Sequence, residues 1–321
     1  MNADVEKQDR DQDGSSIRGR VALIIPTFNA ARHWPAFMEG FRAQSLLPDQ
    51  VIVIDSSSSD GTPRLARSEG FSVFEIPSRD FSHGGTRQMG AELAADAEIL
   101  IYLTQDAVPL GEHAFRNLVR VFDDAEIGAA YGRQIAREAA GPIEAHAREF
   151  NYPPVSSVRS WESRQTLGFK SIFFSNSFGA YRREALMSVG GFSSSVIFGE
   201  DTQIVARLHR AGWKTAYVAD ATARHSHAYT IVEEFRRYFD IGVLHAREGW
   251  LIEHFGGASS EGRRFVVSEL KHLLKHGPHH VPSAILRTFA KYSGYKIGRR
   301  ERGIAPRLKY HLGLNRQFWS R

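Results

Sequence analysis

Apolar and polar stretches alternate regularly through the first hundred residues. Short apolar runs rich in β-branched and aromatic residues are predicted to be strands, at 20–26, 50–55, 71–77 and 99–103. Amphipathic segments follow the first three runs and are predicted to be helices, at 30–44, 62–70 and 82–95. This alternation predicts an α/β fold with a mostly parallel, Rossmann-like sheet and helices on both faces.

The alternation loosens after residue 110. Helices are predicted at 114–123, 183–189 and 202–211, and strands at 127–131, 171–181 and 215–218. Residues 133–170 are predicted to be irregular, and from Thr230 the chain is predicted to be mainly helical, with breaks at Gly256-Gly257, Gly277-Pro278 and Pro306. The pattern divides the chain into a disordered polar lead (1–18), an α/β domain (19–245) and a helical C-terminal extension (246–321).

Five features fall where the predicted strands end or in the loops after them. They are Pro26 and Thr27, Asp55, Asp106, the Glu200-Asp201 pair just before a helix, and His225 and His227 after the last strand. In a parallel α/β sheet, ligands bind outside the carboxyl ends of the strands, and a carboxylate there can hold a divalent cation against a phosphate. Each residue also has a purely structural explanation, such as helix capping for the acids or a surface position for the histidines.

Composition narrows the class of protein. The 321 residues are 42% hydrophobic and 24% charged, which is enough to build one large or two small cores. The chain has no cysteine, so disulfides and cysteine-ligated metals are excluded. The polar first 19 residues lack the apolar core of a signal peptide, and no segment approaches the ~20 apolar residues that cross a bilayer. These features favour a cytoplasmic protein.

The net charge of +5 conceals a basic C-terminal region. Residues 262–321 contain 14 Lys+Arg and 2 Asp+Glu, whereas the rest of the chain is acidic overall. Aromatic residues are interleaved with these cations, at Phe289, Tyr292, Tyr295, Phe318 and Trp319. Such a region suits an anionic membrane surface or, equally, a solvated helical cap on the domain. Nucleic acid is not an expected partner, because the basic and aromatic residues are confined to this tail.

Several motifs, taken together, carry a resemblance to a known family. They are IIPTFN, VIVIDSSSSDGT, TRQMGAELA, YLTQDAVP, FSNSFGAYRREAL, GFSSSVIFGEDTQIVARLHRAGW and the HSH pair of histidines. Over roughly residues 20–245 the chain resembles the inverting family 2 nucleotide-sugar glycosyltransferases of the GT-A fold, and most of all bacterial rhamnosyltransferases. It departs from many of them at Thr104, where they have the first aspartate of an Asp-x-Asp motif.

The resemblance implies roles for individual residues. It implies a nucleotide-sugar site made by Pro26, Thr27, Asp55, Arg87, Gln105, Asp106 and Asn176. Asp106 is the one remaining carboxylate of the motif and is expected to hold Mg²⁺ or Mn²⁺ with His225 or His227. Asp201 matches the family's catalytic base, and Glu200 is expected to support it or touch the acceptor sugar. Ser175 is expected either to contact the transferred sugar or simply to pack.

The expected reaction is transfer of L-rhamnose from dTDP-rhamnose, with inversion, to a cell-surface polysaccharide or lipid-linked glycan. The enzyme is expected to be peripheral on the inner face of the plasma membrane. The nearest alternative is the same fold transferring galactose, glucose or N-acetylglucosamine from a UDP-sugar. A non-enzymatic nucleic-acid-binding or membrane-binding protein is a weaker alternative. A dinucleotide-dependent oxidoreductase is disfavoured, because no G-x-G-x-x-G follows the first strand.

Overall fold

One curled sheet runs through the molecule. The computed structural model describes residues 19–257 and 259–320, so the lead predicted at 1–18 lies outside the described residues. The strand order is β3-β2-β1-β4-β8-β6-β9-β5, and β7 pairs with β9. The strands are β1 (Val21–Thr27), β2 (Gln50–Asp55), β3 (Ser72–Glu75), β4 (Ile99–Leu103), β5 (Val108–Leu110), β6 (Ile127–Ile135), β7 (Ser157–Arg159), β8 (Phe178–Arg182) and β9 (Lys214–Arg224). The strands predicted at 50–55 and 99–103 are therefore confirmed residue for residue.

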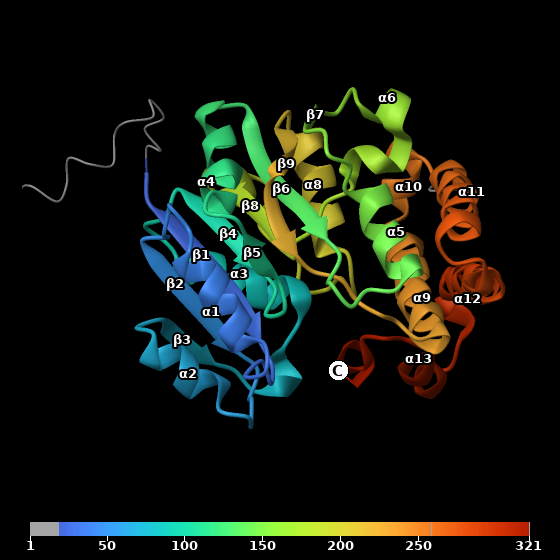
Figure 1. Ribbon diagram of the computed structural model, residues 1–321, viewed down its shortest axis with the longest axis horizontal. Coiled ribbons are helices and arrows are strands. Elements are labelled where there is room, and N and C mark those ends of the chain that lie inside the picture. The colour runs from blue at the N-terminus through green and yellow to red at the C-terminus, as the bar shows by residue number, and fades with distance from the viewer. Residues whose placement is uncertain (1–18, 258, 321) are drawn as a thin grey trace, which may run out of the picture.

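Helices cover both faces of the sheet and build the C-terminal region (Figure 1). They are α1 (Trp34–Arg42), α2 (Thr62–Ser68), α3 (His83–Leu93), α4 (Ala114–Val119), α5 (Pro142–Asn151), α6 (Arg164–Leu167), α7 (Arg183–Ser188), α8 (Glu200–Arg210), α9 (Ile231–Arg247), α10 (Gly249–Phe255), α11 (Ser259–His276), α12 (Val281–Gly298) and α13 (Pro306–Leu312). One core packs α1, α2 and α4 against the sheet, and a second packs α3, α7, α8 and α10 against its other face. The predicted α/β fold with a helical C-terminal extension is confirmed.

Strand direction changes halfway across the sheet. β1 pairs in parallel with both β2 and β4, as the strand–helix alternation predicts. β8 is then inserted antiparallel between β4 and β6, and β5 and β7 pair antiparallel with β9. The sheet as a whole is therefore mixed, with its parallel part at the N-terminal end. Because β8 runs backwards, the residues that precede it lie beside the carboxyl end of β4.

Three local predictions are corrected by the structure. The stretch 133–170, predicted irregular, contains α5, whose apolar face packs on α11 through the Phe150 and Phe265 rings at 5.2 Å. The strand predicted at 171–181 begins only at Phe178, because a 3₁₀ turn and a loop fill 168–177. The acidic pair predicted to precede a helix forms the first turn of α8 itself.

The C-terminal helices pack tightly through glycine. Gly294 and Gly298 of α12 lie against the carbonyl oxygens of Phe235 and Phe239 on α9, where a Cβ atom would collide with the backbone. This close approach fixes α12 to α9, which itself runs across the domain boundary predicted at 245/246. Among the described residues, no helix has both the length and the apolar character needed to cross a membrane.

Candidate active site

A cavity of about 1590 Å³ opens at the carboxyl ends of β1 and β4 and continues among the C-terminal helices. Most of the predicted site residues line it: Pro26, Thr27, Arg87, Gln105, Asp106, Ser175, Asn176, Glu200, Asp201, His225 and His227. Ser175 and Asn176 reach it because they precede the antiparallel strand β8, whose Phe178 pairs with Leu103 at the end of β4. Residues scattered over two hundred positions thus share one site.

Asp106, His225 and His227 form a cluster on one wall. Strand pairing explains their meeting, since Val108 of β5 lies opposite Arg224 of β9, and the loop before β5 is thereby held beside the residues after β9. His225 Nε2 lies 3.4 Å from Asp106 Oδ1, and His227 Nδ1 lies 3.8 Å from Asp106 Oδ2. The potential ligand atoms of all three residues lie within 4.8 Å of one another. One carboxylate and two imidazoles form a donor set that suits a divalent cation.

The neighbouring groups keep Asp106 ionised and His227 neutral, which are the forms that bind a cation. Burial alone would raise the pKa of Asp106, but the hydrogen bond and charge of His225, with the charge of His227, hold it below its ordinary value. Burial and the charge of His225 lower the pKa of His227 to about 4, so His227 is neutral at pH 7. Gln134 Oε1 lies 2.9 Å from His225 Nδ1 and, as an acceptor, fixes the proton there. With its proton on Nδ1, a neutral His225 could offer Nε2 to a cation that Asp106 also binds, in place of the direct contact between these two side chains.

The ends of β1 and β2 form the second part of the site. Thr27 Oγ1 donates to Asp55 Oδ2 at 2.8 Å, and Ser58 donates to the same carboxylate through its N–H and its hydroxyl. Asp55 is fully buried and lies beneath the cavity wall, so it orients Thr27 and the loop after β2. Gln105 is bonded twice to the Phe28 backbone, at 2.6 and 3.1 Å. This leaves the Phe28 ring, 51% exposed, as an aromatic surface at the cavity.

Glu200 and Asp201 lie in the first turn of α8, at another part of the cavity wall. Arg87 Nη1 lies 3.0 Å from Glu200 Oε1, and both side chains are at least nine-tenths buried. Asn176 connects the two acids, since its Nδ2 donates to Glu200 at 3.1 Å and its N–H donates to Asp201 at 3.3 Å. Arg87 is therefore a buried partner of Glu200.

The pKa values of the two acids are shifted in opposite directions. Burial and the negative charge of Glu200 raise the pKa of Asp201 to about 7. Burial opposes the ionisation of Glu200 as well, but the charge of Arg87 outweighs it and lowers the pKa of Glu200. Asp201 is thus poised to gain or lose a proton near neutral pH, which is the property of a general base, while Glu200 stays ionised beside it.

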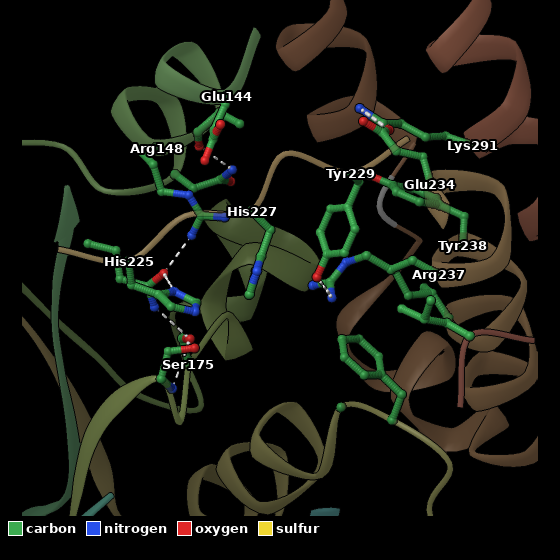
Figure 2. A pocket seen from close by; sticks show the side chains of 18 of the residues that line it. Glu144, Arg148, Ser175, His225, His227, Tyr229, Glu234, Arg237, Tyr238 and Lys291 are labelled. Carbon is green, nitrogen blue, oxygen red and sulfur yellow. Dashed lines mark hydrogen bonds and ion pairs between the residues drawn. The ribbon is translucent and has the colours of Figure 1, made fainter. Parts of the chain in front are cut away.

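Several functional side chains were missed by the sequence reasoning. Gln134 supports His225, Phe28 faces the cavity, and Arg148 on α5 donates to Gln134 Oε1. Figure 2 shows Arg148 and His225 on one side of the cavity, with Tyr229 across it beyond His227. The Gly141-Pro142 dipeptide was an available signal for the start of α5, because Pro is favoured at the first turn of a helix.

A cavity at the carboxyl ends of parallel strands, with a candidate cation site and a separate acidic pair on its wall, is the arrangement expected of a glycosyltransferase of the GT-A type. Residues 22–190 match the family Glycosyl transferase family 2. The chain belongs to glycosyl transferase family 2.

Relatives and solved structures agree with this assignment. The chain is 44% identical to the O-antigen chain rhamnosyltransferase RfbN of Salmonella typhimurium, over 94% of this chain and 96% of RfbN. It is 40% identical to the O-antigen chain rhamnosyltransferase WbaN of Salmonella anatum, over 93% and 95% of the two chains. The mannosyltransferase PcManGT of Pyrobaculum calidifontis, solved with GDP-Man and Mn²⁺, shares the fold at 19% identity, with a TM-score of 0.57 over 88% of this chain and 83% of that one.

Proposed function

We propose that this enzyme transfers L-rhamnose from dTDP-rhamnose, with inversion, to a sugar of a bacterial cell-surface polysaccharide built on a lipid-linked glycan. The observation that carries the proposal is that Asp106 and Asp201 line one cavity, in which a donor and an acceptor can meet between them. The choice of rhamnose is supported by the two Salmonella relatives, both named as O-antigen chain rhamnosyltransferases. We also propose that the catalytic residues belong to a domain of residues 19–245 and that 246–321 form a helical extension, which supplies part of the cavity wall.

On the donor side, the nucleotide is proposed to lie over Thr27 and Phe28, with its base against the Phe28 ring. Asp55 keeps Thr27 in position, and Gln105 keeps the Phe28 backbone in position. The donor set of Asp106, His225 and His227 fits Mg²⁺ or Mn²⁺. When bound there, the cation supplies positive charge against the diphosphate.

On the acceptor side, Asp201 is proposed to act as the general base. It takes the proton of the attacking hydroxyl as that oxygen bonds to the anomeric carbon of rhamnose. The bond between the anomeric carbon and the phosphate oxygen breaks in the same step, and the nucleoside diphosphate leaves with the electron pair. Glu200, held by Arg87 and Asn176, keeps the pKa of Asp201 near neutral pH. Ser175 and Asn176, which line the same cavity, are proposed to contact the transferred sugar.

A donor panel tests the proposal. The purified protein is incubated with MnCl₂ and, in turn, with dTDP-rhamnose, UDP-galactose, UDP-glucose and UDP-N-acetylglucosamine, and release of the nucleoside diphosphate is measured. We expect turnover with dTDP-rhamnose, and its loss on chelation of the metal and in Asp106→Asn. Turnover of a UDP-sugar in its place would contradict the choice of donor, and full activity of Asp106→Asn would contradict the role of that residue.

The outer face of α12 supports a proposed cytoplasmic, peripheral placement on the membrane. Ile285, Leu286 and Phe289 are each more than half exposed and lie at helical spacing on one side of α12, outside the cavity. Lys296 lies seven residues after Phe289 on the same helix, and a cation beside an apolar stripe suits an anionic interface. We expect the protein to sediment with phosphatidylglycerol vesicles and not with phosphatidylcholine vesicles, and Phe289→Ser to weaken this binding. Equal binding to both vesicles would contradict the proposed charge dependence.

A further inference from the structure

The cavity extends well beyond the space that a nucleotide sugar and one acceptor hydroxyl need. Its deeper part, here called the far chamber, lies between α9, α11 and α12. The far chamber is lined by Glu234, Tyr238, Phe265, Glu269, Arg287, Lys291 and Tyr292. None of these residues has a role in the proposed reaction.

A chain of contacts joins the far chamber to the candidate cation site. The Tyr229 ring lies 5.2 Å from the His227 ring, and the Tyr229 carbonyl accepts from Arg287 Nη1 at 2.6 Å. Arg287 Nη1 lies 2.9 Å from Glu234 Oε1, and Lys291 Nζ lies 2.9 Å from Glu234 Oε2. Figure 2 shows this continuity, with Tyr229 between His227 and the Glu234–Lys291 pair. A ligand that begins at the catalytic residues can therefore continue into the far chamber.

Charge in the far chamber is nearly balanced. Arg287 and Lys291 both engage Glu234, and Glu269 is a second acid facing the same space. Both of these cations are already paired with Glu234, and a diphosphate beside them would also meet the Glu269 carboxyl group. Arg237, which lines the cavity as well, stacks on the Phe198 and Tyr229 rings. A neutral ligand avoids repulsion by the Glu269 carboxyl group.

Glu269 is a buried acid in the wall of the far chamber. Only 1% of its surface is exposed, and its Oε1 has no hydrogen-bond partner among the residues that the structure describes. Burial raises the pKa of Glu269 to about 7, against the opposing charge of Arg287, so near neutral pH this group can either donate or accept a hydrogen bond. A sugar hydroxyl, which also donates and accepts, satisfies it in both states.

The aromatic residues complete this set of groups. Lys291 Nζ lies 5.9 Å from the centre of the Tyr238 ring and 5.2 Å from that of the Phe265 ring. The two aromatic rings therefore lie beside a charged hydrogen-bond donor. Apolar faces with a few convergent polar groups suit a sugar ring, which has an apolar C–H face and a rim of hydroxyls.

We propose that the far chamber is an acceptor subsite that binds a second, neutral sugar of the acceptor glycan, with Glu269 and Lys291 hydrogen-bonding its hydroxyls. This inference rests on the proposed function, since it concerns the acceptor of the same reaction. The attacking sugar lies near Asp201, and the next sugar along the glycan occupies the far chamber. The enzyme therefore binds two sugars of its acceptor.

The test compares octyl monosaccharides with octyl disaccharides of galactose, glucose and mannose as acceptors, with dTDP-rhamnose as donor. For the wild type we expect the best disaccharide to have a KM about tenfold below that of the best monosaccharide. Glu269→Met should abolish this preference without changing hydrolysis of dTDP-rhamnose in the absence of acceptor. Its melting temperature should not fall, because an apolar side chain replaces an unpartnered buried acid. Glu269→Gln, which keeps the hydrogen bonds, should retain the preference.

Glu253→Met, on exposed surface of α10 outside the cavity, is the matched control and should behave as the wild type. An unchanged disaccharide preference in Glu269→Met would overturn the inference. So would a wild type that consumes dTDP-rhamnose but accepts no neutral disaccharide, or one that accepts only a glycosyl diphosphate. Failure of the wild type to consume dTDP-rhamnose counts instead against the proposed donor. In that case, calorimetry of disaccharide binding to the wild type and to Glu269→Met tests the subsite, and equal affinities would overturn it.

Discussion

The buried ion pair between Arg87 and Glu200 gives a quantitative prediction. The two side chains are 7% and 6% exposed and lie 3.0 Å apart, so solvent screens them little. Arg87→Met leaves Glu200 as a buried charge that has lost its cationic partner and keeps the hydrogen bond from the Asn176 amide. Breaking such a pair costs about 3–5 kcal/mol of unfolding free energy. The equivalent change at an exposed pair, Arg67→Met opposite Glu75, should cost less than about 1 kcal/mol, because both of its side chains are about half exposed.

Urea unfolding of the two variants at pH 7.5 measures the difference. Arg87→Met/Glu200→Gln should recover part of the loss, because no buried charge remains. The loss should also depend on pH. The charge of Arg87 lowers the folded-state pKa of Glu200 below its ordinary 4.5, so the stability that the pair contributes is present above about 4.5 and fades as pH falls through the folded-state value. If Arg87→Met were no less stable than Arg67→Met at pH 7.5, the account of this pair would be wrong.

Three further predictions follow from buried acids. Transfer should decline below an apparent pKa near 7, because Asp201 works as a carboxylate, and Glu200→Gln should move this acidic limb of the pH–rate profile to lower pH. Asp201→Asn should raise the urea midpoint at pH 8, with a gain that shrinks toward pH 5, because a raised folded-state pKa makes ionisation of Asp201 destabilising as pH rises from about 4 to 7. The Asp240 carboxylate accepts three hydrogen bonds from Leu314 and Asn315, so Asp240→Ala should lower the free energy of unfolding by about 2 kcal/mol and speed trypsin cleavage after Arg316. Unchanged cleavage would contradict the role of Asp240 in holding the C-terminal segment.

The sequence predicted the parallel half of the sheet well because local patterns decide it. Buried parallel strands are apolar throughout, so β2 and β4 could be bounded to the residue. The direction of β8 depends on its position between β4 and β6, and nothing in its own residues expresses that pairing. The sheet was therefore predicted to be mostly parallel, whereas it is mixed.

The convergence of Asp106, His225 and His227 was also predictable, because all three follow strands. Their support was not, since Gln134 lies within the extended β6 and Arg148 lies on α5, a helix whose polar sequence concealed it. α5 is stabilised by α11, through contacts such as His146 Nε2 with Ser268 Oγ at 2.9 Å, more than a hundred residues away along the chain. Likewise, the burial of Arg87 against Glu200 depends on the packing of α3 and α8, which sequence spacing does not encode.

The role of Asp201 is tested most directly by transfer and nucleotide binding measured on one variant. Asp201→Asn should bind dTDP with Mn²⁺ as tightly as the wild type in calorimetry, because Asp201 makes no part of the candidate cation site. Its rate of rhamnose transfer from dTDP-rhamnose should fall at least about 100-fold, the usual contribution of a general base. Transfer at the wild-type rate by Asp201→Asn would contradict the assignment of this carboxylate as the base and, with it, the proposed mechanism.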